Sequence, residues 1–282
     1  MRSCIRVDNL KSVLSKMNAL SDRVAVVTGA ANGIGLALCE AFVAEGMRVV
    51  MSDVDPAALD AAAARIEGDA LAFAADVRQW DEVAALEARA VERYGAVHVL
   101  CNNAGVQLPG ITWEFTREEW EWVLDVNLGG VVHGVHAFLP GMVARGEPGH
   151  VVNTASLGGL IPFAGIAPYT AAKYAVVGLS EGLQNDLRAA GVPIGVSVLC
   201  PGPVLSRLRE NSATFRPGGE GGRDVPLLTA PRLPAEAVAA QVVDAIRNDR
   251  FWILTHPEYN ETIRARTRGI VDTNELVVAE LQ

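Results

Sequence analysis

Seven short apolar runs alternate along the chain with longer segments of helical spacing, and this alternation restricts the fold more than any other feature. Strands covered by helices on both faces of a parallel sheet are buried on both sides, so they read as continuous runs of valine, leucine and isoleucine. The predicted strands cover residues 24–28, 49–52, 71–74, 97–102, 150–155, 194–200 and 251–254. The predicted helices cover residues 34–45, 57–67, 81–94, 117–145, 169–190 and 236–248. We therefore expect an α/β fold, a doubly wound parallel sheet of about seven strands with helices on both faces.

The chain reads as one domain with two atypical segments. Its 282 residues suit a single α/β unit. Residues 1–20 are basic and lack the apolar core of a signal peptide, so we expect a disordered extension before a single domain at 21–282. The alternatives for this segment are a transit peptide and an upstream start codon, with Met17 as the working start. Residues 205–234 are rich in glycine and proline and poorly patterned, which predicts a lid over a ligand site or a mobile loop.

Composition argues against several classes of protein. The formal net charge is −9, and an acidic surface repels phosphate backbones, so no nucleic-acid partner is expected. The four cysteines are widely spaced, which is typical of reduced thiols in a cytoplasmic protein. No uninterrupted apolar run approaches the ~20 residues that span a bilayer, so no membrane association is expected.

A glycine-rich turn directly follows the first predicted strand. It reads TGAANGIG over residues 28–35 and opens a helix. Glycines let the backbone approach a pyrophosphate closely, and the helix N-terminus attracts its charge. A glycine trio in the first βαβ unit is the context of a dinucleotide-binding, Rossmann-type fold. The predicted cofactor-binding residues in this turn are Gly29, Asn32, Gly33, Ile34 and Gly35.

Asp53 indicates which dinucleotide binds. It ends the second predicted strand 18 residues after Gly35, near the ~20 expected for the acid that binds the adenosine ribose. A carboxylate there would repel the 2′-phosphate of NADP, and the glycine turn holds no Arg or Lys to neutralise it. The predicted cofactor is therefore NAD.

Tyr169 and Lys173 stand four residues apart in a predicted helix, so their side chains share one face. A tyrosine phenol titrates near ~10, whereas proton exchange with an alcohol at neutral pH needs a pKa nearer ~7. One nearby cation lowers a pKa by about 1–3 units. We expect Lys173 to lower the pKa of Tyr169, and the positive ring of bound NAD⁺ to supply the remainder, so the cofactor binds before proton transfer.

Three other polar positions lie near predicted strand ends or interrupt a helix. Ser156 follows the strand at 150–155, where its hydroxyl can hold a substrate oxygen. The sequence NNAG at 102–105 lies at the carboxyl edge of the sheet, where such folds bind ligands. Asn127 interrupts a long helix although asparagine is a poor helix former. We expect it to kink the backbone and hold a water that links Lys173 to solvent.

Together these motifs resemble the short, single-domain branch of the short-chain dehydrogenase/reductase family over residues 21–254. The matched positions are TGAANGIG at 28–35, Asp53, Asp76-Val77, NNAG at 102–105, Asn127, Ser156, Tyr169, Lys173 and PGPV at 201–204. The resemblance implies a catalytic tetrad of Asn127, Ser156, Tyr169 and Lys173, with Tyr169 as the general acid/base. It implies that Asp76 and Val77 contact adenine and that Asn103 supports the ribose. Further implied cofactor contacts are Ala104, Gly105, Tyr169, Lys173, Pro201, Gly202, Val204 and Ser206.

One position departs from the family pattern. The family often carries threonine where this chain has Ser206, a smaller hydroxyl donor for the nicotinamide carboxamide. The family analogy also implies a homotetramer or homodimer, packed through the helices at 117–145 and 169–190.

The expected substrate is small and has an apolar or aromatic body. The residues expected near the tetrad are Leu157, Gly158, Phe163 and Val204, which are mostly apolar. Three tryptophans either line this pocket or pack at a helix start or subunit interface: Trp113, Trp120 and Trp122. Arginines of the 205–234 segment could attract an anion, although neighbouring acids partly cancel them: Arg207, Arg209, Arg216 and Arg223. His133 and His136 have no evident third ligand, so no metal is expected.

The sequence predicts an NAD-dependent oxidoreductase that interconverts a secondary alcohol and a ketone. One alternative is an NADP-dependent ketone reductase of the same fold. Another is a dinucleotide-binding sensor without turnover, which the intact tetrad disfavours. A sugar epimerase of the extended branch would need more residues after Val204 than this chain has.

Overall fold

A seven-stranded parallel sheet forms the centre of the molecule in the computed structural model, which describes residues 17, 19–218 and 231–273. The strand order is β3-β2-β1-β4-β5-β6-β7. The strands are β1 (Val24–Thr28), β2 (Arg48–Ser52), β3 (Ala70–Ala72), β4 (Val99–Asn102), β5 (Gly149–Thr154), β6 (Ile194–Cys200) and β7 (Trp252–Leu254). Every strand pair is parallel, which confirms the predicted α/β fold.

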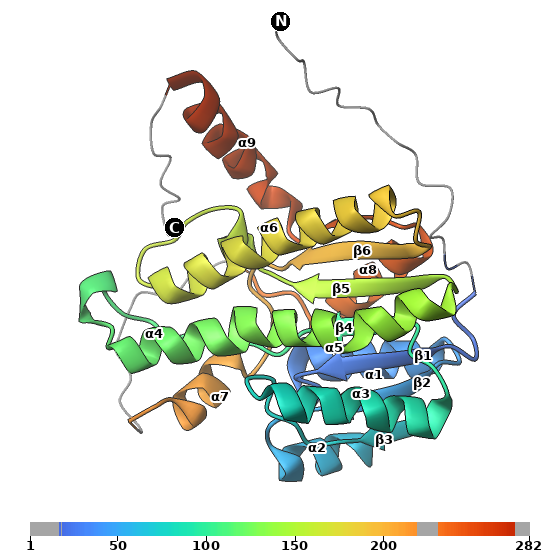
Figure 1. The fold of residues 1–282 in the computed structure, drawn as a ribbon. Helices are drawn as coiled ribbons and strands as arrows, with labels where there is room; N and C mark the ends of the chain where they lie inside the picture. The colour runs from blue at the N-terminus through green and yellow to red at the C-terminus, as the bar shows by residue number, and fades with distance from the viewer. Residues whose placement is uncertain (1–16, 18, 219–230, 274–282) are drawn as a thin grey trace, which may run out of the picture.

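Helices cover both faces of this sheet (Figure 1). One face carries α1 (Gly33–Ala44), α2 (Pro56–Ala63) and α8 (Ala235–Arg247). The other carries α3 (Trp80–Tyr94), α4 (Arg117–Leu124), α5 (Gly130–Arg145) and α6 (Ala167–Ala189). Two further helices, α7 (Leu208–Phe215) and α9 (Asn260–Arg268), lie outside these layers.

Strand β1 shows why the strand sequences are uniformly apolar. Successive side chains of a strand point to opposite faces of the sheet. Ala25 and Val27 pack in the cluster with α1 and α8, whereas Val24 and Val26 pack in the cluster with α3 and α5. All four side chains are fully buried, so no position on this strand tolerates a polar residue without a partner.

A π-helical turn at Asp125–Gly129 joins α4 and α5 into one long helical segment. Asn127 lies in this turn and is fully buried, so the predicted interruption of the helix takes the form of a π turn. Among the described residues, only Arg117–Arg145 has the length and mean hydropathy of a possible membrane span. The segment packs against α3, α6 and the sheet, which is typical of a core helix.

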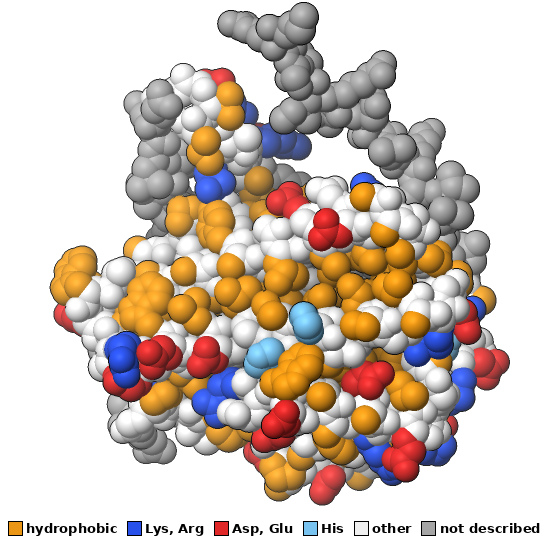
Figure 2. Space-filling view, in the orientation of Figure 1, with side chains coloured by type: hydrophobic (Ala, Val, Ile, Leu, Met, Phe, Trp, Pro, Cys, Tyr) orange, Lys and Arg blue, Asp and Glu red, His pale blue; other side chains and the backbone are white. Residues whose placement is uncertain are grey.

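The outer face of the α4–α6 layer is unusually apolar. Figure 2 shows hydrophobic side chains gathered over these helices. Val132 and Val143 on α5 are exposed, as is Trp80 of α3, whose ring packs against His133 and His136 of α5. The polar face expected of a surface helix is therefore incomplete on this side.

The two atypical segments are described in part. Met17 and Leu20 are buried in the core, whereas the rest of the predicted 1–20 extension lies outside the described residues, apart from Ala19. Within the predicted 205–234 loop, α7 forms a helix and Leu233 forms an isolated bridge with Val204. Residues 219–230 lie outside the described residues, and Arg223 is among them.

Candidate active site

Two neighbouring strand ends, those of β1 and β4, are joined by side chains at the carboxyl edge of the sheet. The Thr28 hydroxyl accepts hydrogen bonds from the backbone amides of Asn103 (3.0 Å) and Ala104 (3.1 Å). The Asn103 amide donates to the carbonyls of Thr28 (3.0 Å) and Gly29 (3.3 Å). The sheet order reverses between these strands, and such a point opens a crevice for a ligand.

The glycine turn leaves no room for side chains. Gly29 (φ +66°) and Gly33 (φ +53°) adopt the left-handed backbone that favours glycine. A Cβ on Gly35 would lie 2.0 Å from the Gly29 carbonyl oxygen, so α1 packs directly on the turn. Gly35 therefore lies beneath the turn and not on the cavity, unlike the other predicted residues of this motif. The bare backbone fits a pyrophosphate group.

Asp53 ends β2 beside this turn. Its carboxylate accepts hydrogen bonds from the backbone amides of Ala31 (3.1 Å) and Asp55 (3.2 Å). Burial raises the pKa of Asp53, and these amides oppose the increase. The carboxylate lines the cavity, where it fits the hydroxyl groups of a ribose.

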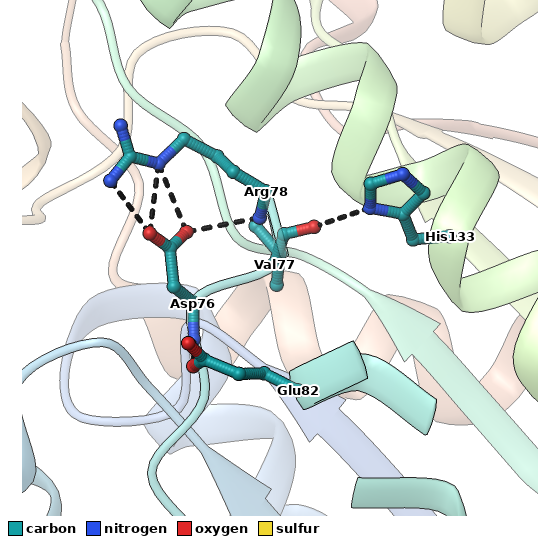
Figure 3. Close-up of polar contacts among 5 residues, drawn as sticks. All are labelled: Asp76, Val77, Arg78, Glu82 and His133. Carbon is teal, nitrogen blue, oxygen red and sulfur yellow. Dashed lines mark hydrogen bonds and ion pairs between the residues drawn. The ribbon is translucent and has the colours of Figure 1, made fainter. Parts of the chain in front are cut away.

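A rigid wall follows β3 and includes Asp76, Val77 and Arg78 (Figure 3). The Arg78 guanidinium pairs with the Asp76 carboxylate at 2.6 Å. Burial raises the pKa of Asp76, but the hydrogen bonds and charge of Arg78 outweigh it and hold that pKa below its usual value. His133 donates to the Val77 carbonyl (2.9 Å), and Glu82 accepts from the Asp76 amide (2.7 Å). Arg78 is thus engaged by a neighbouring carboxylate.

Tyr169 and Lys173 lie on one face of α6 and are both buried. The Lys173 Nζ lies 5.5 Å from the centre of the Tyr169 ring and donates to the Thr154 carbonyl at 2.8 Å. Ser156 forms a hydrogen bond with the Tyr169 phenol. The Ser156 hydroxyl is held in turn by the Gly158 amide at 3.0 Å. These three side chains therefore converge on one wall of the cavity.

Burial controls the protonation of this pair. It raises the pKa of Tyr169, and the Ser156 hydrogen bond offsets only part of the increase. It also lowers the pKa of Lys173 to about 7. The expectation that Lys173 lowers the tyrosine pKa is therefore not met by the protein groups alone, because desolvation disfavours both charged forms.

Asn127 reaches the same wall from the π turn. Its side-chain amide donates to the carbonyls of Val106 and Val123, both at 2.9 Å, and its oxygen accepts from the Val106 amide at 3.2 Å. A Cβ on Gly105 would lie 2.9 Å from this oxygen and 3.6 Å from the Lys173 Nζ. Glycine at 105 thus leaves space between Asn127 and Lys173.

One cavity of about 540 Å³ brings the predicted site residues together. Apart from Gly35, every predicted cofactor, catalytic and substrate residue lines it, including Leu157, Gly158, Phe163, Val204 and Ser206. Further lining residues had no predicted site role: Val54, Ala75, Arg78, Val106, Gln107, Val126, Thr154, Ala155, Ile166, Pro203, Leu208, Glu210, Asn211, Phe215 and Arg232. Most of these carry no motif and reach the cavity only through tertiary packing.

The tryptophans and histidines singled out in the sequence lie in different surroundings. Trp122 lines the cavity, Trp120 packs edge-on against Phe115 at 6.4 Å, and Trp113 is 84% exposed. His133 and His136 both pack against the Trp80 ring. Within the described residues, no group of three or more metal-ligating side chains occurs.

His256 braces the backbone that follows β6. Its Nδ1 accepts from the Gly202 amide (3.1 Å), which assigns the ring proton to Nε2, and Nε2 donates to the Pro203 carbonyl (3.0 Å). A Cβ on Gly202 would lie 2.8 Å from the ring. Gly202, Pro203 and Val204 all line the cavity, so His256 is a positioning residue for that wall.

The low pKa of Lys173 predicts a stability effect. The unfolded chain holds this proton up to pH ~10.5, whereas the folded chain releases it near pH 7. The unfolded state then binds more protons between these values, so the contribution of Lys173 to stability rises with pH across that window. Lys173→Met should stabilise the cofactor-free protein by about 2 kcal/mol at pH 7, and less at pH 10. Urea unfolding at both pH values measures this. Leu187→Met on the same helix is the control, and an equal Lys173→Met effect at both pH values would contradict the expectation.

Replacing His256 should loosen the wall that it braces. His256→Phe keeps a ring but leaves the Gly202 amide and the Pro203 carbonyl unpaired. This should lower the free energy of unfolding by about 1–3 kcal/mol. NADH affinity, measured by fluorescence, should fall about tenfold. His256→Asn, which can still accept at the Nδ1 position, should retain part of the affinity. An unchanged NADH affinity in the phenylalanine variant would remove His256 from the site.

Comparison with known proteins agrees with this geometry. Residues 23–216 match the family model described as short chain dehydrogenase. A crystal structure of a short chain dehydrogenase/reductase from Burkholderia phymatum in complex with NAD is 36% identical, with a TM-score of 0.87, covering 94% of this chain and 99% of that one.

Two sequence relatives are named as dehydrogenases. A CLA biosynthesis dehydrogenase/reductase of Lactiplantibacillus plantarum is 32% identical, covering 90% of this chain and 95% of the relative. A 1-deoxy-11-beta-hydroxypentalenate dehydrogenase of Streptomyces exfoliatus is 38% identical, covering 90% and 88%. The chain belongs to the short-chain dehydrogenase/reductase family of oxidoreductases.

Proposed function

We propose that this protein is an NAD-dependent oxidoreductase that interconverts a secondary alcohol and a ketone. The convergence of Tyr169, Ser156 and Lys173 in the cavity that also holds the glycine turn and Asp53 carries the proposal. A proton donor, an orienting hydroxyl and a dinucleotide cradle within one enclosed space are what such a reaction requires.

The side chains have distinct roles in this reaction. Bound NAD⁺ supplies the hydride acceptor and a positive charge beside the phenol. Tyr169 exchanges the proton of the substrate hydroxyl, and Ser156 orients the same oxygen. Lys173 would hold the nicotinamide ribose and, in its charged form, favour the phenolate. Asn127 holds the water that passes the proton to solvent. Because burial raises the pKa of Tyr169, the phenolate forms only after the cofactor binds.

The charges around the ribose site support NAD over NADP. Asp53 presents a carboxylate to the cavity, where it would repel a 2′-phosphate. Arg78 also lines the cavity, but its guanidinium is held by Asp76 and is not available to neutralise that phosphate. The similar Burkholderia phymatum structure was solved with NAD.

The lining near the tetrad supports an apolar or aromatic substrate body. Leu157, Phe163 and Trp122 face the cavity with Ile166 and Phe215. The Streptomyces relative is named for a hydroxyl-bearing substrate, which supports oxidation of an alcohol. The exposed apolar face over α4–α6 supports a homodimer or homotetramer, and three buried free cysteines support a reducing, cytoplasmic location.

Removing the phenol tests the catalytic role. Tyr169→Phe should lower the turnover number at least about 10³-fold while NADH affinity stays within about twofold. A panel of secondary alcohols with NAD⁺, followed by NADH absorbance, measures turnover. Tyr174→Phe, in the same helix, is the matched control and should keep parental activity. Substantial turnover by Tyr169→Phe would contradict the mechanism. No turnover by the parent with any alcohol would favour a dinucleotide sensor.

Asp53 should determine cofactor choice. We expect the parent to bind NADH at least about tenfold more tightly than NADPH, because the Asp53 carboxylate would repel the 2′-phosphate of NADPH. Asp53→Ser should reduce this preference to about threefold or less, whereas Asp60→Ser on exposed α2 should preserve it. Fluorescence titration with both cofactors measures the ratio. Tighter binding of NADPH by the parent would favour the NADP-dependent ketone reductase.

A further inference from the structure

Helix α7 presents one stripe of residues to the body of the protein. Arg209 and Ser212 stand at positions i and i+3 of this helix and so share a face, and Arg216 directly follows the helix. Ser212 is buried and accepts a hydrogen bond from the Gln107 amide at 2.8 Å. Arg216 pairs with the buried Glu119 of α4. These two contacts hold the stripe against the protein, which directs Arg209 toward the cavity that Gln107 also lines.

Two cavity-lining arginines have no acidic partner among the residues that the structure describes. Arg207 pairs with Glu210 at 3.0 Å, and Arg216 pairs with Glu119. Neither Arg209 nor Arg232 takes part in an ion pair or side-chain hydrogen bond within the described part of the chain, and both line the cavity. Burial and the nearby charge of Arg232 lower the pKa of Arg209, so the two guanidinium groups repel one another.

A pair of like charges facing one cavity is stabilised by an anion between them. The pair lies in a chain of net charge −9, so the local cationic patch opposes the overall charge. Arginine forks match the two oxygens of a carboxylate. The same cavity also has apolar lining residues, among them Phe163, Ile166 and Phe215, together with the polar Glu210 and Asn211 of α7. The expected ligand therefore combines an apolar body with one anionic end.

We propose that Arg209 and Arg232 bind a carboxylate at the end of the substrate remote from its reacting carbon. The substrate class is then a hydroxy acid or keto acid with an apolar body. This inference rests on the proposed function for the reaction at Tyr169, but the arginine pair itself can be tested without turnover.

Binding of octanoate and of 1-octanol to the NADH-saturated protein tests the pair, since these ligands share a chain length and differ in charge. Calorimetry should show octanoate binding at least about tenfold more tightly than 1-octanol. The double variant Arg209→Leu/Arg232→Leu should abolish this preference. Arg207→Leu, an exposed arginine of the same segment that does not line the cavity, should retain it. Arg209→Lys, which keeps the charge and loses the fork, should give an intermediate preference.

The outcomes distinguish a substrate carboxylate from the cofactor phosphates as the anion that the arginines bind. Equal binding of the two ligands by the parent, or an unchanged preference in the double variant, overturns the proposal. A double variant that loses NADH affinity and keeps the octanoate preference assigns the arginines to the cofactor phosphates and also overturns it. If no secondary alcohol is oxidised, the proposed reaction fails, while a charge-dependent octanoate preference would still establish the carboxylate site.

Discussion

The hydrogen bonds between the end of β1 and the end of β4 determine where everything else in the site can lie. Asn103 and Ala104 donate four hydrogen bonds to Thr28 and Gly29 across this junction, and each bond joins a side chain to the backbone. The glycine turn is thereby fixed relative to the NNAG segment at 102–105. Because Gly35 packs on the Gly29 carbonyl, the N-terminus of α1 follows the same junction. The dinucleotide cradle and the floor of the cavity are consequently one rigid unit.

The wall that carries Tyr169, Lys173 and Asn127 is built on different elements and meets this unit at Gly105. Lys173 from α6 and Asn127 from the π turn approach opposite sides of that residue, where any side chain would collide with Asn127. Both polar groups are buried, and each is held by backbone hydrogen bonds. A cation enclosed in this way has a pKa of about 7, so its charge depends strongly on what else occupies the site. Burial thus provides a site whose protonation responds to its ligand.

Much of this arrangement could be predicted from sequence, because it follows from local patterns. Strands β1 and β6 have the predicted bounds, and all but one of the predicted site residues line the cavity. Helices α7 and α9 were not predicted, since both are short and polar and α9 buries no residue. The role of His256 depends on a contact with residues 54 positions away, which no local pattern reveals. The pKa of Tyr169 could not be predicted either, because sequence shows the neighbouring lysine but not how deeply both groups are buried.

The π turn at Asp125–Gly129 has a consequence for how this scaffold can change. A π turn holds one extra residue relative to an α-helix. The side chains after it are therefore rotated about the helix axis relative to those before it, compared with an uninterrupted α-helix. The α5 part of the segment packs tightly on the sheet, because Gly134 approaches Asn102 of β4 closely. The α4 half carries Trp122 and Glu119, which shape the cavity mouth and anchor α7. Substitutions of these two α4 side chains can therefore reshape the entrance while Asn127 keeps its backbone hydrogen bonds to Val106 and Val123.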